Sequence, residues 1–258
     1  MTAIGDTTGK LDIGRVIQET FAVLGRNFVT FLVLSVLLTG IPTAILYGVQ
    51  GNLVTNGLTA GLGTRVFSSF LGAVVAGLCG LILQGTIIYG TVSDLNGRRV
   101  SVADSLRVGL YAFLPMLLIG IMMALAIGVG LFLLIVPGVM LAIAWCVAIP
   151  AYVVERPRIM DVFGRSAELT RGNRWRIFGL VLIWVIAMLI VEMVFAVIGG
   201  LSSLATVGGF PLLTRLVVLP LIQVINGLIG ATGVAALYVE LRQIRDGVGP
   251  AGLAAIFD

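Results

Sequence analysis

Long stretches without a single charged residue divide this chain and limit what it can fold into. The three longest cover residues 27–64, 66–93 and 108–154, which are 38, 28 and 47 residues long. About 20 residues of helix cross the roughly 30 Å of hydrocarbon in a bilayer. The chain is 59% hydrophobic and only 11% charged, with a mean hydropathy of +1.14, whereas about a quarter of the residues in a soluble domain are charged. We therefore predict a protein that crosses a membrane several times.

The crossing segments are predicted to be helices. A membrane-spanning barrel would show polar and apolar residues alternating over about 10 positions, but residues 131–136 are all apolar. Val136-Pro137-Gly138 supplies a turn that divides the longest run in two. The result is an all-α fold, a single transmembrane domain over residues 1–258, with spans at residues 28–49, 66–93, 110–135, 139–154, 177–198 and 212–237.

The basic residues predict the orientation. With these spans, Arg65 is the one basic residue in the connections on one side and Arg215 lies just inside span six, which leaves 14 of the 16 Lys and Arg on the other side. The positive-inside bias makes that side, with both termini, cytoplasmic. The basic residues flank apolar spans, so anionic lipid headgroups are the expected partners and nucleic acid is not. The expected headgroup contacts are Arg15, Arg26, Arg98, Arg99, Arg107, Arg165, Arg171, Arg174, Trp175 and Arg176.

Charged segments with helical periodicity precede the spans. Ile13, Val16, Ile17, Phe21 and Leu24 recur at three- and four-residue spacing between charged positions, which is typical of an amphipathic helix at the membrane surface. A similar pattern precedes span five, and a weaker one precedes span three. We predict three helical hairpins, each preceded by a cytoplasmic amphipathic helix, in repeat units 10–93, 94–154 and 155–241, with a short tail at 242–258.

Few polar residues fall inside the predicted spans. Glu192 needs a partner there, because a lone charge at mid-membrane costs about 2.5–3.5 kcal/mol. Arg215 is expected at a comparable depth, so we predict a Glu192–Arg215 pair that locks helices five and six; an ion or proton site is the alternative. Gln84, Gln223 and Asn226 are expected to form interhelical hydrogen bonds or, alternatively, to line a polar path.

No catalytic constellation is visible. The chain has no histidine, so sites that need one are excluded, including histidine metal ligands and Ser-His-Asp triads. The embedded carboxylates are not paired in a way that acid-base catalysis would require. We predict a protein that is not an enzyme and that carries no cofactor and no metal.

One segment resembles a known family. It begins with Val136-Pro137-Gly138, continues with Trp145, Pro150 and Glu155, and ends with the stretch from Arg165 to Trp175. It resembles the YciC-like proteins of bacteria and the membrane domain attached to some glycerophosphodiester phosphodiesterases. The resemblance covers roughly 40 residues. It implies a six-helix bundle in the bacterial inner membrane with no established general activity. The fused phosphodiesterases use histidines in a separate catalytic domain, so their hydrolase activity is not transferred to this chain.

Two functions remain after these exclusions. The first is a non-enzymatic integral inner-membrane protein in membrane, envelope or lipid organisation, or an accessory subunit of a membrane complex. The second is a small transporter, channel or lipid-moving protein with a polar path near Glu192, Arg215, Gln223 and Asn226. A protein partner or a homo-oligomer is left open.

Overall fold

A computed structural model describes residues 10–55, 62–98, 100–204 and 214–247, and these residues contain helices and no strands. Two of the elements are single π-helical turns, η1 and η2. The elements are α1 (Ile13–Arg26), α2 (Phe28–Ser35), η1 (Val36–Gly40), α3 (Ile41–Thr55), α4 (Leu62–Leu95), α5 (Val102–Leu133), α6 (Ile135–Ala144), α7 (Ala148–Glu155), α8 (Ile159–Thr170), α9 (Arg174–Leu204), η2 (Thr214–Val218) and α11 (Leu219–Asp246).

Six helical segments in the described part of the chain are long and apolar enough to cross a membrane. They are Phe28–Val49, Val66–Leu95, Val102–Leu133, Ile135–Glu155, Arg174–Val194 and Leu216–Asp246. Each overlaps one predicted span, which confirms the all-helical class and the number of apolar helices. The molecule is therefore a multi-pass membrane protein.

Two prolines follow π-helical turns. Pro42 is the second residue of α3 and comes after η1, and Pro220 is the second residue of α11 and comes after η2. A proline inside a helix has no N–H to donate and its ring clashes with the carbonyl four residues earlier. A wider π turn just before the proline relieves that conflict and keeps the helical course continuous. The chain therefore passes through both prolines without ending a helix.

The fourth span is broken near its middle. Pro150 lies in the first turn of α7, and residues Trp145, Cys146 and Val147 form a turn between α6 and α7. The carbonyl of Ala144 accepts hydrogen bonds from Ser166 Oγ (2.9 Å) and Thr170 Oγ1 (3.3 Å) of α8. Side chains of α8 therefore satisfy a backbone group that the break leaves without its helical partner.

Two predicted boundaries are wrong. The longest apolar run turns at Leu134, whose extended backbone separates α5 from α6, so Pro137 lies in the first turn of α6 and not in the turn itself. A proline is tolerated there because the first turn has free N–H groups anyway. In addition, no separate helix precedes α5 within the described residues of the 94–107 segment. Ser101 caps α5, and its helix continues unbroken into the span.

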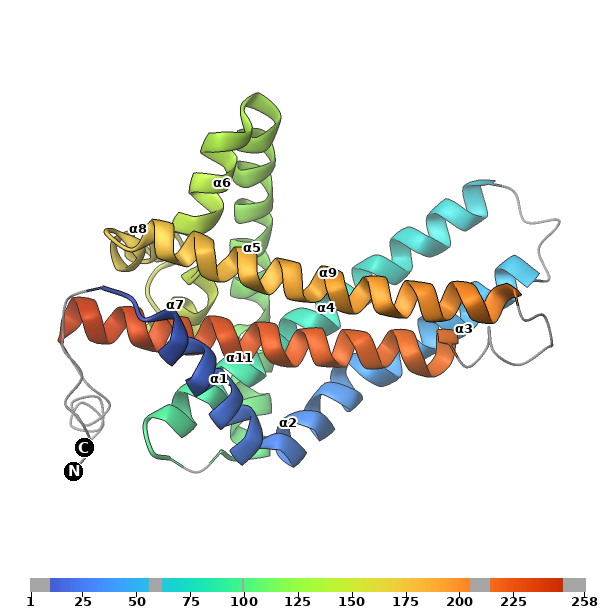
Figure 1. Cartoon of the computed structure of the whole chain (residues 1–258), viewed down its shortest axis with the longest axis horizontal. Helices are drawn as coiled ribbons and strands as arrows, with labels where there is room; N and C mark the ends of the chain where they lie inside the picture. The colour runs from blue at the N-terminus through green and yellow to red at the C-terminus, as the bar shows by residue number, and fades with distance from the viewer. Residues whose placement is uncertain (1–9, 56–61, 99, 205–213, 248–258) are drawn as a thin grey trace.

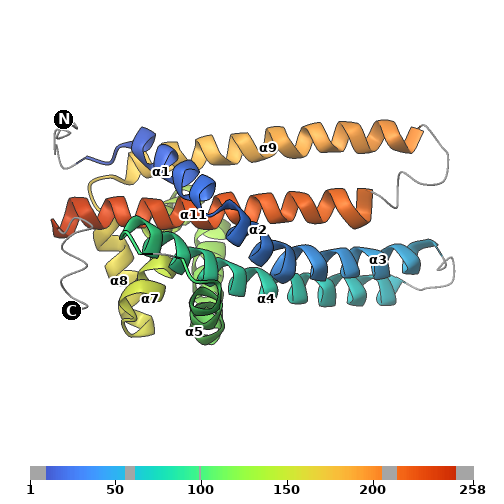
Figure 2. The same cartoon turned by 90° about the horizontal axis from the view of Figure 1, so that it is seen from below.

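The long helices do not all run in one direction. In both views α9 and α11 lie side by side (Figures 1 and 2). Figure 1 shows α5 and α6 running across them, and Figure 2 shows α5 nearly along its own axis. The apolar helices therefore do not all run parallel to one another. Helix α5 also packs closely against α4. The two helices meet at Gly85 and Gly109, where a Cβ on Gly85 would lie 3.3 Å from the Gly109 Cα. Small residues allow two helix backbones to approach this closely.

The largest buried cluster lies where α1, α7, α8, the start of α9 and the last turns of α11 meet side chains of α4 and α5. We call this region the charged end; it is on the left in Figure 1. Leu11, Ile177, Tyr238 and Leu241 are fully buried there. By contrast, only 6–39% of the apolar window of each span is buried inside the protein. The charged end is thus packed like a soluble core, while the remaining helix surface suits a lipid environment.

Candidate functional site

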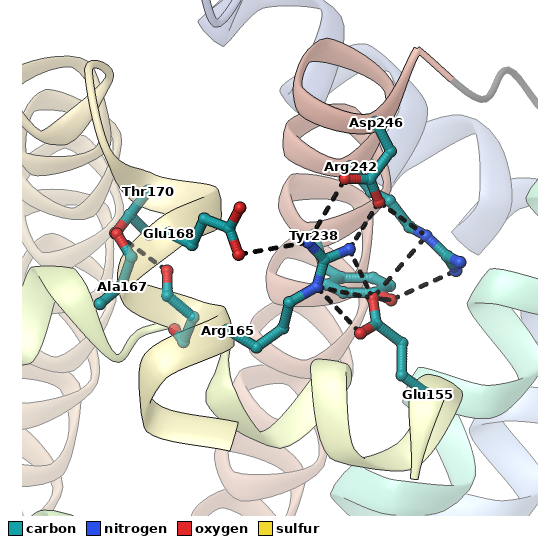
Figure 3. Close-up of polar contacts among 9 residues, drawn as sticks. Glu155, Arg165, Ala167, Glu168, Thr170, Tyr238, Arg242 and Asp246 are labelled. Carbon is teal, nitrogen blue, oxygen red and sulfur yellow. Dashed lines mark hydrogen bonds and ion pairs between the residues drawn. The ribbon is translucent and has the colours of Figure 1, made fainter. Parts of the chain in front are cut away.

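Arg165 lies between two carboxylates at the charged end. Its guanidinium donates to Glu155 through Nε (2.9 Å) and Nη2 (3.1 Å), and to Asp246 through Nη2 (2.5 Å). Figure 3 shows how α7, α8 and α11 each contribute one of these residues. The hydrogen bonds to Glu155, and then those to Asp246, raise the pKa of Arg165 above its ordinary value. The cluster therefore fastens α8 to the ends of α7 and α11.

Tyr238 and Arg242 extend this cluster along one face of α11. The Tyr238 hydroxyl donates to Glu155 Oε1 (2.8 Å) and accepts from Arg242 Nη1 (3.4 Å). Arg242 Nε also lies 3.5 Å from Asp246 Oδ2. Every charge in the group faces an opposite charge. We read the cluster as a structural clamp that holds the charged end together.

A second contact fastens α1 to α11. Arg15 Nη1 donates to both oxygens of Glu240 at 3.3 and 3.4 Å. Glu240 is only 3% exposed, so its charge depends on this partner. The Glu240 carboxylate raises the pKa of Arg15. Burial, and then the Glu240 charge, raise the pKa of Glu19 on the next turn of α1.

Replacing Arg15 with Gln should destabilise the protein by about 1–2 kcal/mol. The change leaves the buried Glu240 carboxylate without its cation, a cost that the solvent around half-exposed Arg15 partly reduces. Thermal unfolding in mild detergent measures the loss. Adding Glu240→Gln should restore most of the stability, because no unpaired charge then remains; equal stability of wild type and Arg15→Gln would contradict this role.

A large groove lies between α9 on one side and α3 and α4 on the other, with α11 along its base and α1 at one end. Its volume is about 1060 Å³. On α11 the lining runs from Gln223 to Leu237, which is about 21 Å at 1.5 Å per residue. One leaflet of hydrocarbon is about 15 Å thick. The groove is therefore longer than one leaflet is thick.

The groove exists because α9 packs against little protein. Only 6% of its 18-residue apolar window is buried, and its main contacts are with α1 and α6. Trp184 reaches across to α11, where a Cβ on Gly230 would lie 3.5 Å from the Trp184 ring. The walls are made mostly of aliphatic side chains and glycine. Gly77 and Gly80 of α4 face the groove, and a Cβ added at either position would have no neighbouring atom within 4 Å.

Three polar residues singled out in the sequence meet in this groove. Gln84 of α4 and Gln223 and Asn226 of α11 all line it. The Asn226 Oδ1 atom is buried and accepts no hydrogen bond from the described residues. Glu192 is exposed on α9 and is not part of the lining. The predicted Glu192–Arg215 pair stays a prediction, because the Arg215 side chain lies outside the described residues.

The predicted headgroup residues lie in several different environments. Arg15, Arg26 and Arg165 form ion pairs within the protein, Arg26 with Asp94 at 2.5 Å. The acidic partners Glu155, Asp94, Glu240 and Asp246 were missed, although the sequence shows them in the same charged segments. Arg171, Arg174, Trp175 and Arg176 lie at the junction of α8 and α9, where Trp175 is 86% exposed. Arg107 is exposed on α5, and Arg99 lies outside the described residues.

The groove and the charged end are thus the two candidate sites, and they differ in kind. The charged end is well packed, and its Arg15 and Arg165 are paired with carboxylates, whereas the groove is open and contains an acceptor, Asn226 Oδ1, without a donor among the described residues. Comparisons of the chain with protein-family models, with curated proteins and with solved structures find no match.

Proposed function

We propose that this protein is a non-enzymatic integral membrane protein that holds the acyl chains of a membrane lipid in the groove between α3, α4, α9 and α11. The observation that carries the proposal is the groove itself: about 1060 Å³ of mostly apolar space beside a helix with almost no protein contact. In a membrane, lipid chains are the molecules present to fill such a space. The role is one of lipid organisation.

Size and shape favour a lipid over a small polar ligand. Pockets for drug-sized molecules measure about 300–1,000 Å³ and enclose most of the ligand. This groove is at the upper limit, is elongated and is partly open along α9. A chain that extends along α11 for about 21 Å would contact Leu83, Met188 and Val234 from three helices.

The charged end is placed on the cytoplasmic side in this proposal, with α1 and α8 in the headgroup layer. The positive-inside bias supports this orientation, as do the exposed apolar side chains of Phe21 on α1 and Met160 on α8. Membership in the YciC-like group of the bacterial inner membrane fits the same picture and stays a prediction, as do the threefold repeat and any partner protein or second copy.

Filling the groove tests the proposal. The double variant Gly77→Phe/Gly80→Phe adds two rings to the groove wall at positions where an added Cβ meets no atom within 4 Å. The fold should tolerate it, because glycine is a poor helix former. Phospholipid that stays bound to the protein purified in mild detergent, measured by phosphate assay and native mass spectrometry, should fall at least fivefold.

The matched control is Gly120→Phe/Gly128→Phe on α5. These glycines also have open space around them but lie outside the groove. Bound lipid should match wild type in the control. Equal lipid retention by the wild type and the groove-filled variant would mean that the groove does not hold lipid.

A second function, lipid movement between leaflets, has one observation in its favour. Gln84, Gln223 and Asn226 place polar groups partway along the apolar groove, where a headgroup in transit would need hydrogen bonds. Vesicles reconstituted with the protein should then exchange a fluorescent lipid between leaflets faster than empty vesicles. Replacing Asn226 and Gln223 with Leu should remove that gain, and an exchange rate equal to that of empty vesicles would leave lipid organisation as the function.

A further inference from the structure

Four basic residues gather where the segment before α1 meets the turn between α8 and α9. The Leu11 N–H donates to Asn173 Oδ1 (2.9 Å), and Arg176 Nη1 donates to the Leu11 carbonyl (2.6 Å). Leu11 is fully buried and Asn173 is 6% exposed, so this connection is well packed. Lys10 precedes Leu11 in the chain, so its backbone lies next to the turn that carries three arginines. We call Lys10, Arg171, Arg174 and Arg176 the basic junction.

The charges of the basic junction are not neutralised within the described part of the protein. Lys10, Arg171 and Arg174 have no ion pair there, and Arg176 bonds only to the neutral Leu11 carbonyl. The nearest acids in sequence are engaged elsewhere: Asp12 accepts from the Arg15 N–H, and Glu168 pairs with Arg165. The Arg174 Nε atom is buried and has no acceptor among the described residues. No carboxylate of the described residues therefore forms an ion pair with the basic junction.

The basic junction continues into the groove. The Ile13 side chain lies against Gly179, where its Cδ1 would be 3.9 Å from an added Cβ, so the first turns of α1 and α9 are in contact. Ile17 and Phe21 of α1, together with Leu180 of α9, then line the end of the groove. Arg176 is one helical turn before Leu180. A lipid whose chains lie in the groove at this end would have its headgroup among these cations.

We propose that the basic junction binds the phosphate of an anionic phospholipid whose acyl chains occupy the groove. This inference rests on the proposed lipid-binding function and adds the lipid class. Charge complementarity supports it. The junction has four positively charged groups, which attract an anionic headgroup. The headgroup of a zwitterionic lipid carries a positive group of its own, which these four groups would repel.

Lipid competition in native mass spectrometry tests the headgroup separately from the chains. The full-length protein is exchanged into detergent with equal amounts of phosphatidylglycerol and phosphatidylcholine that have identical acyl chains. Wild type should retain the anionic lipid preferentially. In Lys10→Gln/Arg174→Gln the preference should fall about fivefold for each residue removed, because a basic residue near an anionic surface contributes about 1 kcal/mol.

The control is Arg158→Gln/Arg245→Gln, which removes two exposed cations that have no ion pair among the described residues and lie outside the basic junction. It should keep the wild-type preference, and both doubles should keep the wild-type unfolding temperature. Equal retention of the two lipids by wild type would overturn the headgroup inference but leave chain binding in the groove intact. Loss of both lipids in Gly77→Phe/Gly80→Phe, but not in Lys10→Gln/Arg174→Gln, would further separate chain binding in the groove from headgroup binding at the basic junction. If millimolar inorganic phosphate alone stabilised the delipidated protein as much as phosphatidylglycerol does, the site would be one for free anions and the inference would be wrong.

Discussion

Replacing Gly109 with Ala should lower the free energy of unfolding by about 3 kcal/mol, one of the two largest effects expected in this protein. An added methyl group would collide with Thr86 Oγ1, and would lie only 2.8 Å from the Ile82 carbonyl and 3.0 Å from the Thr86 N–H nitrogen. The last two atoms belong to the backbone of α4, so they cannot rotate away. Overpacking of this kind costs about 1–3 kcal/mol or more, because α4 and α5 must separate at their crossing.

Thermal unfolding in mild detergent, followed by circular dichroism, measures this loss. The control is Gly120→Ala on the same helix, where the methyl group meets no other atom. It should leave stability unchanged or raise it by up to about 1 kcal/mol, because alanine is the better helix former. A Gly109→Ala protein as stable as Gly120→Ala would show that α4 and α5 do not cross in close contact.

Replacing Arg165 with Gln should destabilise the protein by about 2–3 kcal/mol. The change removes the guanidinium between Glu155 and Asp246 and leaves Arg242, whose Nε lies 3.7 and 3.5 Å from their oxygens, as their one cationic partner among the described residues. Removing one partner of a fully buried ion pair costs about 3–5 kcal/mol. The side chains of Arg165 and Glu155 are about one-fifth exposed, so solvent reduces that cost.

Limited proteolysis and thermal unfolding test the clamp together. Loss of the Arg165 contacts should release α8 from α7 and α11, so cleavage around α8 should speed up more than cleavage elsewhere. Arg158→Gln, which removes an exposed cation next to the start of α8, should behave like wild type. If both variants unfolded at the wild-type temperature, the cluster would be a set of surface pairs without a structural role.

The number and identity of the apolar helices could be predicted because hydrophobic length is a local property. A run such as residues 66–93 must cross hydrocarbon whatever the rest of the chain does. The breaks were less predictable. Pro150 interrupts its span, whereas Pro42 and Pro220 sit behind π turns that keep the helix continuous. Proline is equally visible in all three places, but the hydrogen-bond partners that decide its effect come from elsewhere in the fold.

The charged end shows the same limit. Glu155, Glu240 and Asp246 stand in segments that are visibly charged in the sequence, and yet their pairing with Arg15 and Arg165 joins residues up to 225 positions apart. Charge counting predicts which side of the membrane these residues face. Charge counting gives no distances between residues. It therefore cannot distinguish an arginine that is paired with carboxylates from one that has no ion pair.

By itself, the sequence determined that this protein is helical, that it crosses a membrane several times and that polar residues such as Gln84 and Asn226 are rare inside it. Only the tertiary structure decided that α9 stands apart from α3 and α4, that three of those polar residues face one groove and that Leu11 contacts Asn173 and Arg176 near its end. The physical reason is that crossing a bilayer depends on the composition of single segments. A groove depends on which helix faces remain unpacked after all the segments have met.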